Sequence, residues 1–204
     1  NCNGQLIDLN TPKIMGILNL TPDSFYDGGK YIDVENALRK TEEMLLDGAA
    51  FIDIGAFSSK PGAEEISEEE ESRRLFPVLE KLVGEFPHAL FSIDTCRSQI
   101  ADESLKIGAC MINYISGGKF DSKLMEVVGK HSAPYVLMHM KGSPKNMQDN
   151  PKYDDIIQEM LYYFSEKVQE AYGHGINDII IDPGFGFGKN IDHNYELLKN
   201  LELF

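Results

Sequence analysis

Six short runs of apolar residues are spaced along the chain, and within each run the apolar residues are continuous rather than alternating with polar ones. Such runs are typical of parallel strands that are covered on both faces. The pattern predicts strands at residues 13–19, 50–55, 90–95, 110–116, 134–139 and 178–184.

Amphipathic segments separate these runs. Val34, Ala37, Leu38, Met44 and Leu45 recur at near-helical spacing, and the segments 75–83 and 156–168 show the same pattern. Strand and helix therefore alternate, which predicts an α/β fold with right-handed crossovers. The stretches "DGAAFID", "IGACMIN" and "HGINDIIID" each place a glycine at a helix end and a strand after it. Because no linker rich in Gly, Pro or Ser interrupts the alternation, we expect residues 1–204 to form a single domain.

The predicted strands share a further property, since polar residues stand at or near their carboxyl ends. These residues are Asn19, Asp53, Asp94, Asn113, His139 and Asp182. In parallel α/β folds the carboxyl ends of the strands form the face that binds ligands. A single Asp at such a position is more often a helix cap, but six polar residues together favour a polar pocket above an apolar floor.

Composition and charge narrow the classes of partner. The net charge of −14 argues against nucleic acid and anionic membranes as partners, although a local basic cluster can still bind a small anion. No apolar run approaches 18 residues and the first ten residues lack a secretion pattern, so we expect neither a membrane span nor export. The three cysteines, Cys2, Cys96 and Cys110, are too few for a disulfide framework and favour a reducing, cytoplasmic location. Cys96 is a possible catalytic thiol, but a buried filler is the favoured interpretation.

Two long motifs resemble a known family. "IMGILNLTPDSFYDGG" and "IIDPGFGFGKNIDHN" are similar to the most specific signatures of the dihydropteroate synthases, the folate-pathway enzymes that sulfonamides inhibit. "IDIGAFSSKPGA", "SIDTCR", "MINYISGG" and "YVLMHMKGSPKNMQ" resemble the intervening segments in the same order. The resemblance implies a (β/α)8 barrel of the TIM type, with its first six βα units in this chain. It also implies a homodimer that uses Mg²⁺ to join 4-aminobenzoate to 6-hydroxymethyl-7,8-dihydropterin diphosphate, releasing diphosphate.

The resemblance also implies a pterin site. Its expected residues are Asp94, Asn113, Ile115, Met138, Asp182 and Gly186. A carboxylate such as Asp182 can accept two adjacent N–H groups of the pterin edge side by side, and an Asn offers both a donor and an acceptor. A turn-capping role for Asp182 stays an alternative, as does a core role for Ile115 and Met138.

The resemblance also implies residues that bind the second substrate and the metal, and loops that cover the site. By resemblance Asn19 contacts Mg²⁺ and diphosphate, and the aminobenzoate site contains Ser59, Lys60, Pro61 and Phe187. The expected catalytic residues are Asp23, Phe25 and Lys60. Asp23 and Phe25 lie in loop 21–31, which we expect to close over the site together with loop 56–66. Lys189 is either close to the mouth of the barrel or an ordinary surface lysine.

Several features depart from the family pattern. Lys60 stands where the family has Arg, Phe57 where it has a carboxylate, and Tyr114 where it has Asp. The chain reaches Phe204 within or just after the sixth helix, whereas the family barrel has two more βα units that supply further cationic groups. We therefore expect open strand edges and a low activity of the 204-residue chain. Two alternatives remain, a methyltetrahydrofolate corrinoid methyltransferase and a non-catalytic pterin-binding fragment, although "LTPDSF" and "SSKPG" favour the synthase.

Overall fold

The computed structural model describes residues 1–21, 34–57, 66–114, 121–142, 147 and 151–204. Six strands lie in this part of the chain, with ends that differ by one or two residues from the predicted ones. They are β1 (Ile14–Asn19), β2 (Ala49–Gly55), β3 (Leu90–Asp94), β4 (Met111–Tyr114), β5 (Tyr135–Met138) and β6 (Ile179–Asp182). The helices are α2 (Val34–Leu46), α3 (Glu68–Glu85), α4 (Ser98–Ile107), α5 (Leu124–Lys130), α6 (Ile156–Gly173) and α7 (Ile191–Lys199), with a short 3₁₀ turn at Leu201–Leu203.

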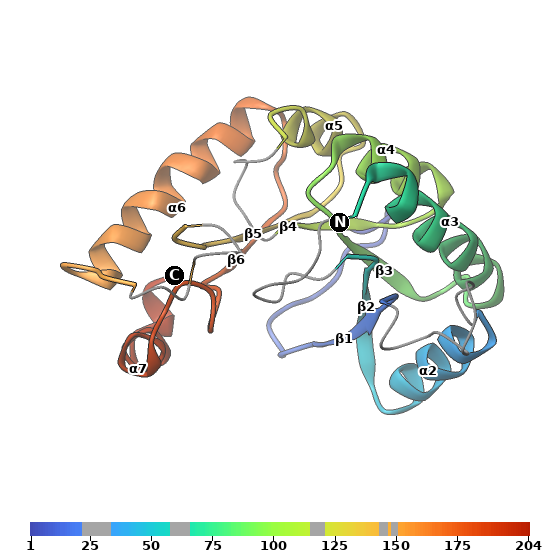
Figure 1. Ribbon diagram of the computed structural model, residues 1–204, viewed down its shortest axis with the longest axis horizontal. Coiled ribbons are helices and arrows are strands. Elements are labelled where there is room, and N and C mark those ends of the chain that lie inside the picture. Colours follow the sequence, from blue (N-terminus) through green and yellow to red (C-terminus); the bar gives the residue numbers. More distant parts are fainter. Residues whose placement is uncertain (22–33, 58–65, 115–120, 143–146, 148–150) are drawn as a thin grey trace.

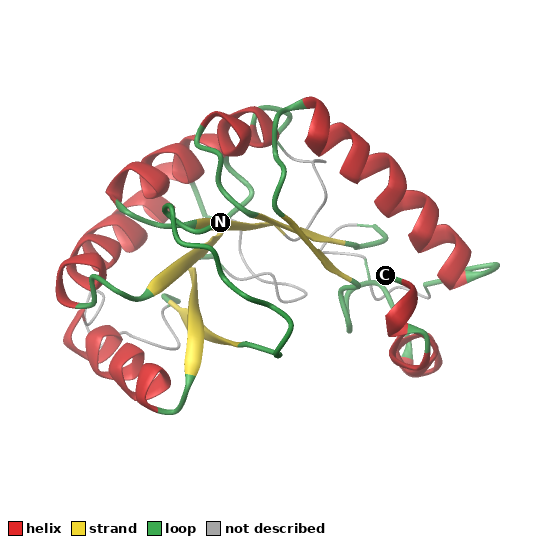
Figure 2. Cartoon of the chain, turned by 180° about the vertical axis from the view of Figure 1, so that it is seen from behind, coloured by secondary structure: helices red, strands yellow, loops and turns green. Residues whose placement is uncertain are grey.

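The strands form one parallel sheet in which spatial order equals chain order, β1 to β6. Figure 1 shows the sheet curving, with helices α2 to α6 in an arc on its outer side, and Figure 2 shows the same arc from behind. This is the arrangement of the first six βα units of a TIM-type barrel, as the resemblance implied. The strands β1 and β6 are the two edges of the sheet, and Ile14 and Ile17 on β1 are 62% and 68% exposed. The expected open edges are thus confirmed.

Alternate residues of each strand face opposite sides of the sheet. One set packs against the helices and forms the main core, which includes Leu18, Ile54, Ile93, Ile112 and Leu137, all fully or almost fully buried. These residues lie side by side in the register, as in the pairs Leu18–Ile54 and Ile93–Ile112. The other set faces the inside of the curve and builds the floor and the site.

The floor of the barrel is apolar. Phe51, Met111 and Val136 come from three strands and form one buried cluster with Cys2 and Cys110. The segment before β1 is held there by a hydrogen bond of 3.2 Å from Asn3 Nδ2 to the carbonyl oxygen of Gly108. This closed floor leaves the carboxyl ends of the strands as the open side of the inner face.

Local sequence signals set the helix ends. The Ser67 side chain accepts a hydrogen bond of 3.2 Å from the backbone N–H of Glu70 and caps α3, and Asp155 caps α6 through Gln158 in the same way. Gly108 ends α4 with a φ of +135°, a conformation that glycine adopts without a Cβ penalty. In the described residues no helix is long and apolar enough to cross a membrane.

Candidate active site

Four residues at the carboxyl ends of β1 to β4 lie in one row of the sheet. Asn19 pairs with Gly55, Gly55 with Asp94, and Asp94 with Asn113. A Cβ at Gly55 would lie 3.4 Å from Asn19 Oδ1 and 3.4 Å from Asp94 Oδ2. The missing side chain of Gly55 therefore leaves room for the two flanking polar groups on the inner face.

Beneath this row, the buried Asp53 of β2 pairs with Asn113. Asn113 Nδ2 donates a hydrogen bond of 2.9 Å to Asp53 Oδ2, which orients the amide. Burial raises the pKa of Asp53, while the Ser92 hydroxyl and the Asn113 amide lower it in part. The sequence pattern included Asp53 only as one of six polar residues near the strand ends, although Asp53 is not the last residue of its strand. Its hydrogen bond to Asn113 was not predicted.

Asp94 is the most perturbed carboxyl of the site. Burial, followed by the negative charges of Asp53 and Glu71, raises its pKa well above the usual range. The Glu71 carboxylate is itself fully buried, accepting a hydrogen bond of 2.7 Å from Thr95 Oγ1 and pairing with Arg97. Within the described part of the chain, Asp94 Oδ1 is buried and has no hydrogen-bond partner. An unpaired buried oxygen of this kind is suited to a ligand that brings its own donor.

Asp182 lies at the carboxyl end of β6, the other edge strand of the sheet, where it pairs with Met138 of β5. Its Oδ1 accepts a hydrogen bond of 2.7 Å from the backbone N–H of Gly184, so the turn-capping role of Asp182 is confirmed. Burial raises the pKa of Asp182, and the Gly184 N–H and the charge of Lys189 lower it in part. A carboxylate has about four lone-pair positions, so capping the turn leaves Asp182 able to accept further hydrogen bonds.

The loop after Asp182 covers an apolar wall of the mouth. Met138, Met140 and Met147 form a buried cluster, against which Phe57 and Phe187 pack. Phe57, one of the departures from the family pattern, is therefore part of this wall. Gly186 lies on the outside of the loop, where its exposed N–H donates to Asn194 Oδ1 at 2.8 Å.

The structure thus brings several predicted site residues to one end of the barrel. Those in the described residues are Asn19, Asp94, Asn113, Met138, Asp182, Gly186 and Phe187. Six others lie outside the described residues, namely Asp23, Phe25, Ser59, Lys60, Pro61 and Ile115. In the part of the chain that is described, no three His, Cys, Asp or Glu side chains form a group that could hold a metal ion.

His139 faces away from the mouth, contrary to the expectation that the polar residues at the strand ends converge there. His139 follows the inward-facing Met138, so it lies on the opposite face and packs edge-on against Tyr163 of α6, with ring centroids 4.9 Å apart. Tyr114 is fully buried among the core residues and stacks on Tyr135 at 6.4 Å. The departure from the family pattern at Tyr114 is therefore accommodated in the outer core.

The cysteines agree with the interpretation of Cys96 as a buried filler rather than a catalytic thiol. Cys2, Cys96 and Cys110 are all free thiols. Burial raises the pKa of Cys96 to about 11, which leaves little thiolate at neutral pH. Cys96 is thus a filler rather than a nucleophile.

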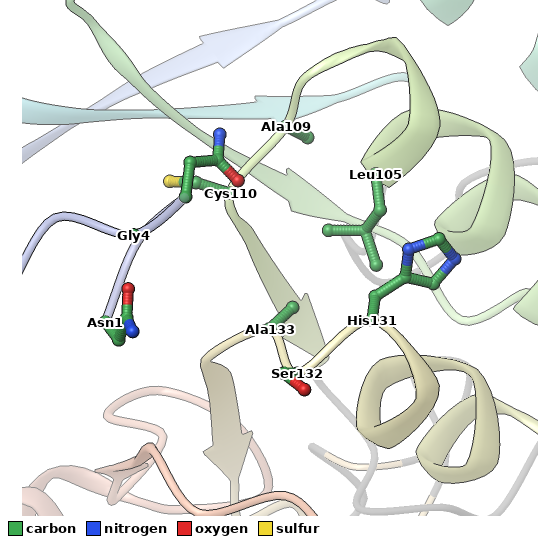
Figure 3. A pocket seen from close by; sticks show the side chains of 9 residues that line it. Asn1, Gly4, Leu105, Ala109, Cys110, His131, Ser132 and Ala133 are labelled. Carbon is green, nitrogen blue, oxygen red and sulfur yellow. The ribbon is translucent and has the colours of Figure 1, made fainter.

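A second hollow, of about 210 Å³, lies at the opposite end of the strands (Figure 3). It is lined by Asn1, Asn3, Gly4, Leu105, Ala109, Cys110, His131, Ser132 and Ala133. Cys110 directly precedes β4, so this hollow is at the end where the strands begin. In TIM-type barrels that end serves stability and the other end carries the chemistry.

The burial of Asp53 predicts a pH-dependent effect on stability. Asp53→Asn is expected to raise the free energy of unfolding at neutral pH by roughly 0.5–2 kcal/mol, because the amide keeps an acceptor for Asn113 and carries no buried charge. The folded-state pKa of Asp53 is raised, so Asp53 makes the wild type lose stability as the pH rises from about 4 through that pKa, and the variant lacks this contribution to the loss.

Urea unfolding from acidic to neutral pH measures this difference. The control is Asp47→Asn, on an exposed residue after α2, which is expected to leave stability unchanged. A stability difference for Asp53→Asn that is constant with pH would contradict the assignment of a costly buried charge.

Comparison with known proteins places this constellation in a family. Residues 15–204 match the pterin binding enzyme family. Over 203 residues the chain is 43% identical to the dihydropteroate synthase of Escherichia coli (strain K12), covering 98% of this chain and 71% of that protein. The chain belongs to the dihydropteroate synthase family. The resemblance seen in the sequence motifs is therefore confirmed over almost the whole chain.

Solved structures of dihydropteroate synthases agree with the fold. The Yersinia pestis enzyme, in a complex with a sulfonamide drug, superimposes with a TM-score of 0.91 at 43% identity, covering 98% of this chain and 73% of that one. The Xanthomonas albilineans enzyme with 4-aminobenzoic acid gives a TM-score of 0.88 at 38% identity, covering 98% and 71%.

Proposed function

We propose that this chain carries the pterin site of a dihydropteroate synthase, which condenses 6-hydroxymethyl-7,8-dihydropterin diphosphate with 4-aminobenzoate to give dihydropteroate and diphosphate. The observation that carries the proposal is the row of polar groups at the strand ends, in which a buried, unpaired oxygen of Asp94 lies beside Asn113. Membership of the dihydropteroate synthase family supports the same reaction.

The pterin ring fits the chemistry of this row. Its amino-pyrimidinone edge carries adjacent N–H donors, and Asp182 and Asp94 offer carboxylate oxygens to accept them. Asn113 is oriented by its bond to Asp53, so its amide oxygen is available to a ligand donor. Met138 supplies an apolar wall for the flat ring, Ile115 a second one, and Gly186 lies beside the site.

The second substrate would lie toward the loops. We assign Phe187 and the loop residues Ser59, Lys60 and Pro61 to aminobenzoate, with Lys60 as the cation for its carboxylate. Phe25 would pack on the aromatic ring and exclude water, and Asp23 would hold the closed loop. A sulfonamide that resembles aminobenzoate would compete at the same place.

The donor set at the mouth fits Mg²⁺. Asn19 Oδ1 is a hard oxygen ligand on the inner face above Gly55, and Mg²⁺ in proteins keeps several waters and completes its shell with substrate phosphates. Asn19 would hold the ion together with the diphosphate. When bound, Mg²⁺ stabilises the negative charge of the departing diphosphate.

The reaction needs no protein nucleophile. The bond between the pterin methylene carbon and the diphosphate oxygen breaks, and its electron pair leaves with diphosphate. The amine nitrogen of aminobenzoate then forms the C–N bond and loses a proton. The Asp182 and Asp94 carboxylates hold the pterin ring so that its methylene faces the amine, an effect of orientation. The high pKa of Cys96, about 11, agrees with this alkyl transfer.

Formation of dihydropteroate tests the proposal. The protein is mixed with both substrates and Mg²⁺, and the product is followed by mass spectrometry, with controls that omit each substrate or chelate the metal. Product that depends on both substrates and falls by about 10²-fold without Mg²⁺ is expected, the typical cost of removing one charge stabiliser. Methyl transfer from methyltetrahydrofolate to a corrinoid would favour the first alternative. Because a low activity of this chain is expected, only a complete lack of product despite pterin binding would favour the non-catalytic fragment.

We also infer a homodimer in the cytoplasm. Three free cysteines agree with a reducing compartment. Light scattering of the purified protein tests the dimer, and a monomeric mass at working concentration would contradict it.

A further inference from the structure

Lys189, which follows the loop after β6, is only 3% exposed. Its ammonium nitrogen lies 2.9 Å from the carbonyl oxygen of Phe187, 3.2 Å from the carbonyl oxygen of His139 and 3.1 Å from His139 Nδ1. A lysine is almost never fully buried without partners. The interpretation of Lys189 as an ordinary surface lysine is therefore wrong, and its burial indicates a specific role.

The three contacts match the three N–H donors of an ammonium group. Each contact is an acceptor if the His139 ring carries its proton on Nε2, so this geometry assigns that tautomer. All three acceptors are neutral. The positive charge of Lys189 is therefore not neutralised by a carboxylate among these three contacts. It can interact electrostatically with other groups nearby.

Asp182 lies close to this charge, because the backbone N–H of His139 donates a hydrogen bond of 3.0 Å to the Asp182 carbonyl oxygen while the His139 carbonyl oxygen accepts one of 3.2 Å from Lys189. The Lys189 ammonium lowers the pKa of Asp182 against the effect of burial. Burial lowers the pKa of Lys189 to about 8, and the charge of Asp182 opposes that shift. The two groups therefore stabilise each other's charged form inside a poorly hydrated environment.

The same contacts tie the site loop to the end of β5. His139 contributes both a ring nitrogen and a carbonyl oxygen, and Phe187 belongs to the loop. The loop also packs closely on this strand end, since a Cβ at Gly188 would lie 2.7 Å from the carbonyl oxygen of Lys141. Tyr153 adds a hydrogen bond of 2.9 Å from its hydroxyl to the Gly188 oxygen.

Other titratable groups on the elements around Lys189 already have partners. Lys141 pairs with Glu159 at 2.8 Å, and the Tyr163 hydroxyl donates to the carbonyl oxygen of Met138 at 3.2 Å. His193 of α7 packs edge-on against Tyr153 at 4.9 Å. None of these described groups is a carboxylate beside Lys189, which leaves Asp182 as its electrostatic partner.

We propose that Lys189 is a positioning residue that keeps Asp182 ionised and holds the loop 183–188 on β5, so that Asp182 can accept the N–H groups of a pterin. The proposal rests on the function proposed above. It goes further because it makes ligand binding depend on a second, buried charge that touches neither substrate.

The first test compares Lys189→Met with the wild type and with Lys189→Arg. Binding of 6-hydroxymethylpterin is measured by calorimetry from acidic to alkaline pH, with Lys199→Met on the exposed surface of α7 as the control. In the acidic range Lys189→Met is expected to bind the pterin at least tenfold more weakly than the wild type. As the pH is lowered, the affinity of the variant should begin to fall at a higher pH than the affinity of the wild type. Above a pH of about 8, where Lys189 loses its own charge, the difference should narrow, and Lys189→Arg should retain the wild-type midpoint.

A purely structural role would weaken binding equally at every pH and leave the midpoint unchanged, which would overturn the proposal.

The second test needs neither Lys189→Met nor a ligand. Nuclear magnetic resonance follows the titration of the Lys189 side chain in the wild type and in Asp182→Asn. A lower pKa of Lys189 in Asp182→Asn supports the coupling, and an unchanged pKa overturns it. Because this titration uses no pterin, it stands apart from any failure of the proposed function.

Discussion

Asp182→Asn is expected to weaken pterin binding by roughly 2–4 kcal/mol, which corresponds to a factor of about 30 to 1,000 in affinity. The amide has one acceptor oxygen instead of two and loses the charge that strengthens both hydrogen bonds. Its Oδ1 must also continue to accept from the N–H of Gly184, now at 2.7 Å. The buried amide nitrogen would then face donors of the ligand. Calorimetry with 6-hydroxymethylpterin measures the change.

The control for this experiment is Asp192→Asn on the exposed first turn of α7, which should bind like the wild type. Circular dichroism establishes that each variant is folded. A folded Asp182→Asn protein with wild-type affinity would remove Asp182 from the pterin site and leave it only as the cap of its turn.

Gly184→Ala is expected to lower the free energy of unfolding by about 2–5 kcal/mol. Two effects add up here. Gly184 has a φ of +68°, where an L-residue costs roughly 1–2 kcal/mol, and its Cβ would lie 2.3 Å from the carbonyl oxygen of His139, an overpacking that costs about 1–3 kcal/mol. Urea denaturation measures the change. The displaced loop should also weaken pterin binding, since Gly184 donates to Asp182.

Gly186→Ala provides a matched control in the same loop. Gly186 has a φ of +82°, but nothing lies within 4 Å of a Cβ at this position. Only the conformational cost of roughly 1–2 kcal/mol should remain. Equal destabilisation by the two substitutions would show that the close approach to His139 carries no energy.

Much of the fold was predictable because it depends on local pattern. Continuous apolar runs predicted all six strands, amphipathic segments located the helices α2, α3 and α6, and Gly108 was correctly placed at a helix end. The row Asn19, Asp94 and Asn113 was predictable for a related reason. Carboxyl ends of parallel strands meet at one face, so the position along the strand fixes the place in space.

Prediction from the sequence fails where a residue lies just beyond a strand or two residues before its end. His139 follows β5, so the alternation places it against α6, away from the mouth. Asp53 lies two residues before the end of β2, and only the register with Ser92 and the bond to Asn113 reveal its place. The burial of Lys189 depends largely on two acceptors of His139, just after β5, which is 50 residues away in the chain and gives no local signal.

A crystal structure of the protein with bound 6-hydroxymethylpterin tests the central claim most directly. The account predicts the pterin at the carboxyl ends of the strands, with its N–H edge within hydrogen-bond distance of Asp182 and Asp94 and its ring near Asn113 and Met138. Density for the pterin at the opposite end of the barrel, or its absence from this row at saturating concentration, would contradict the account.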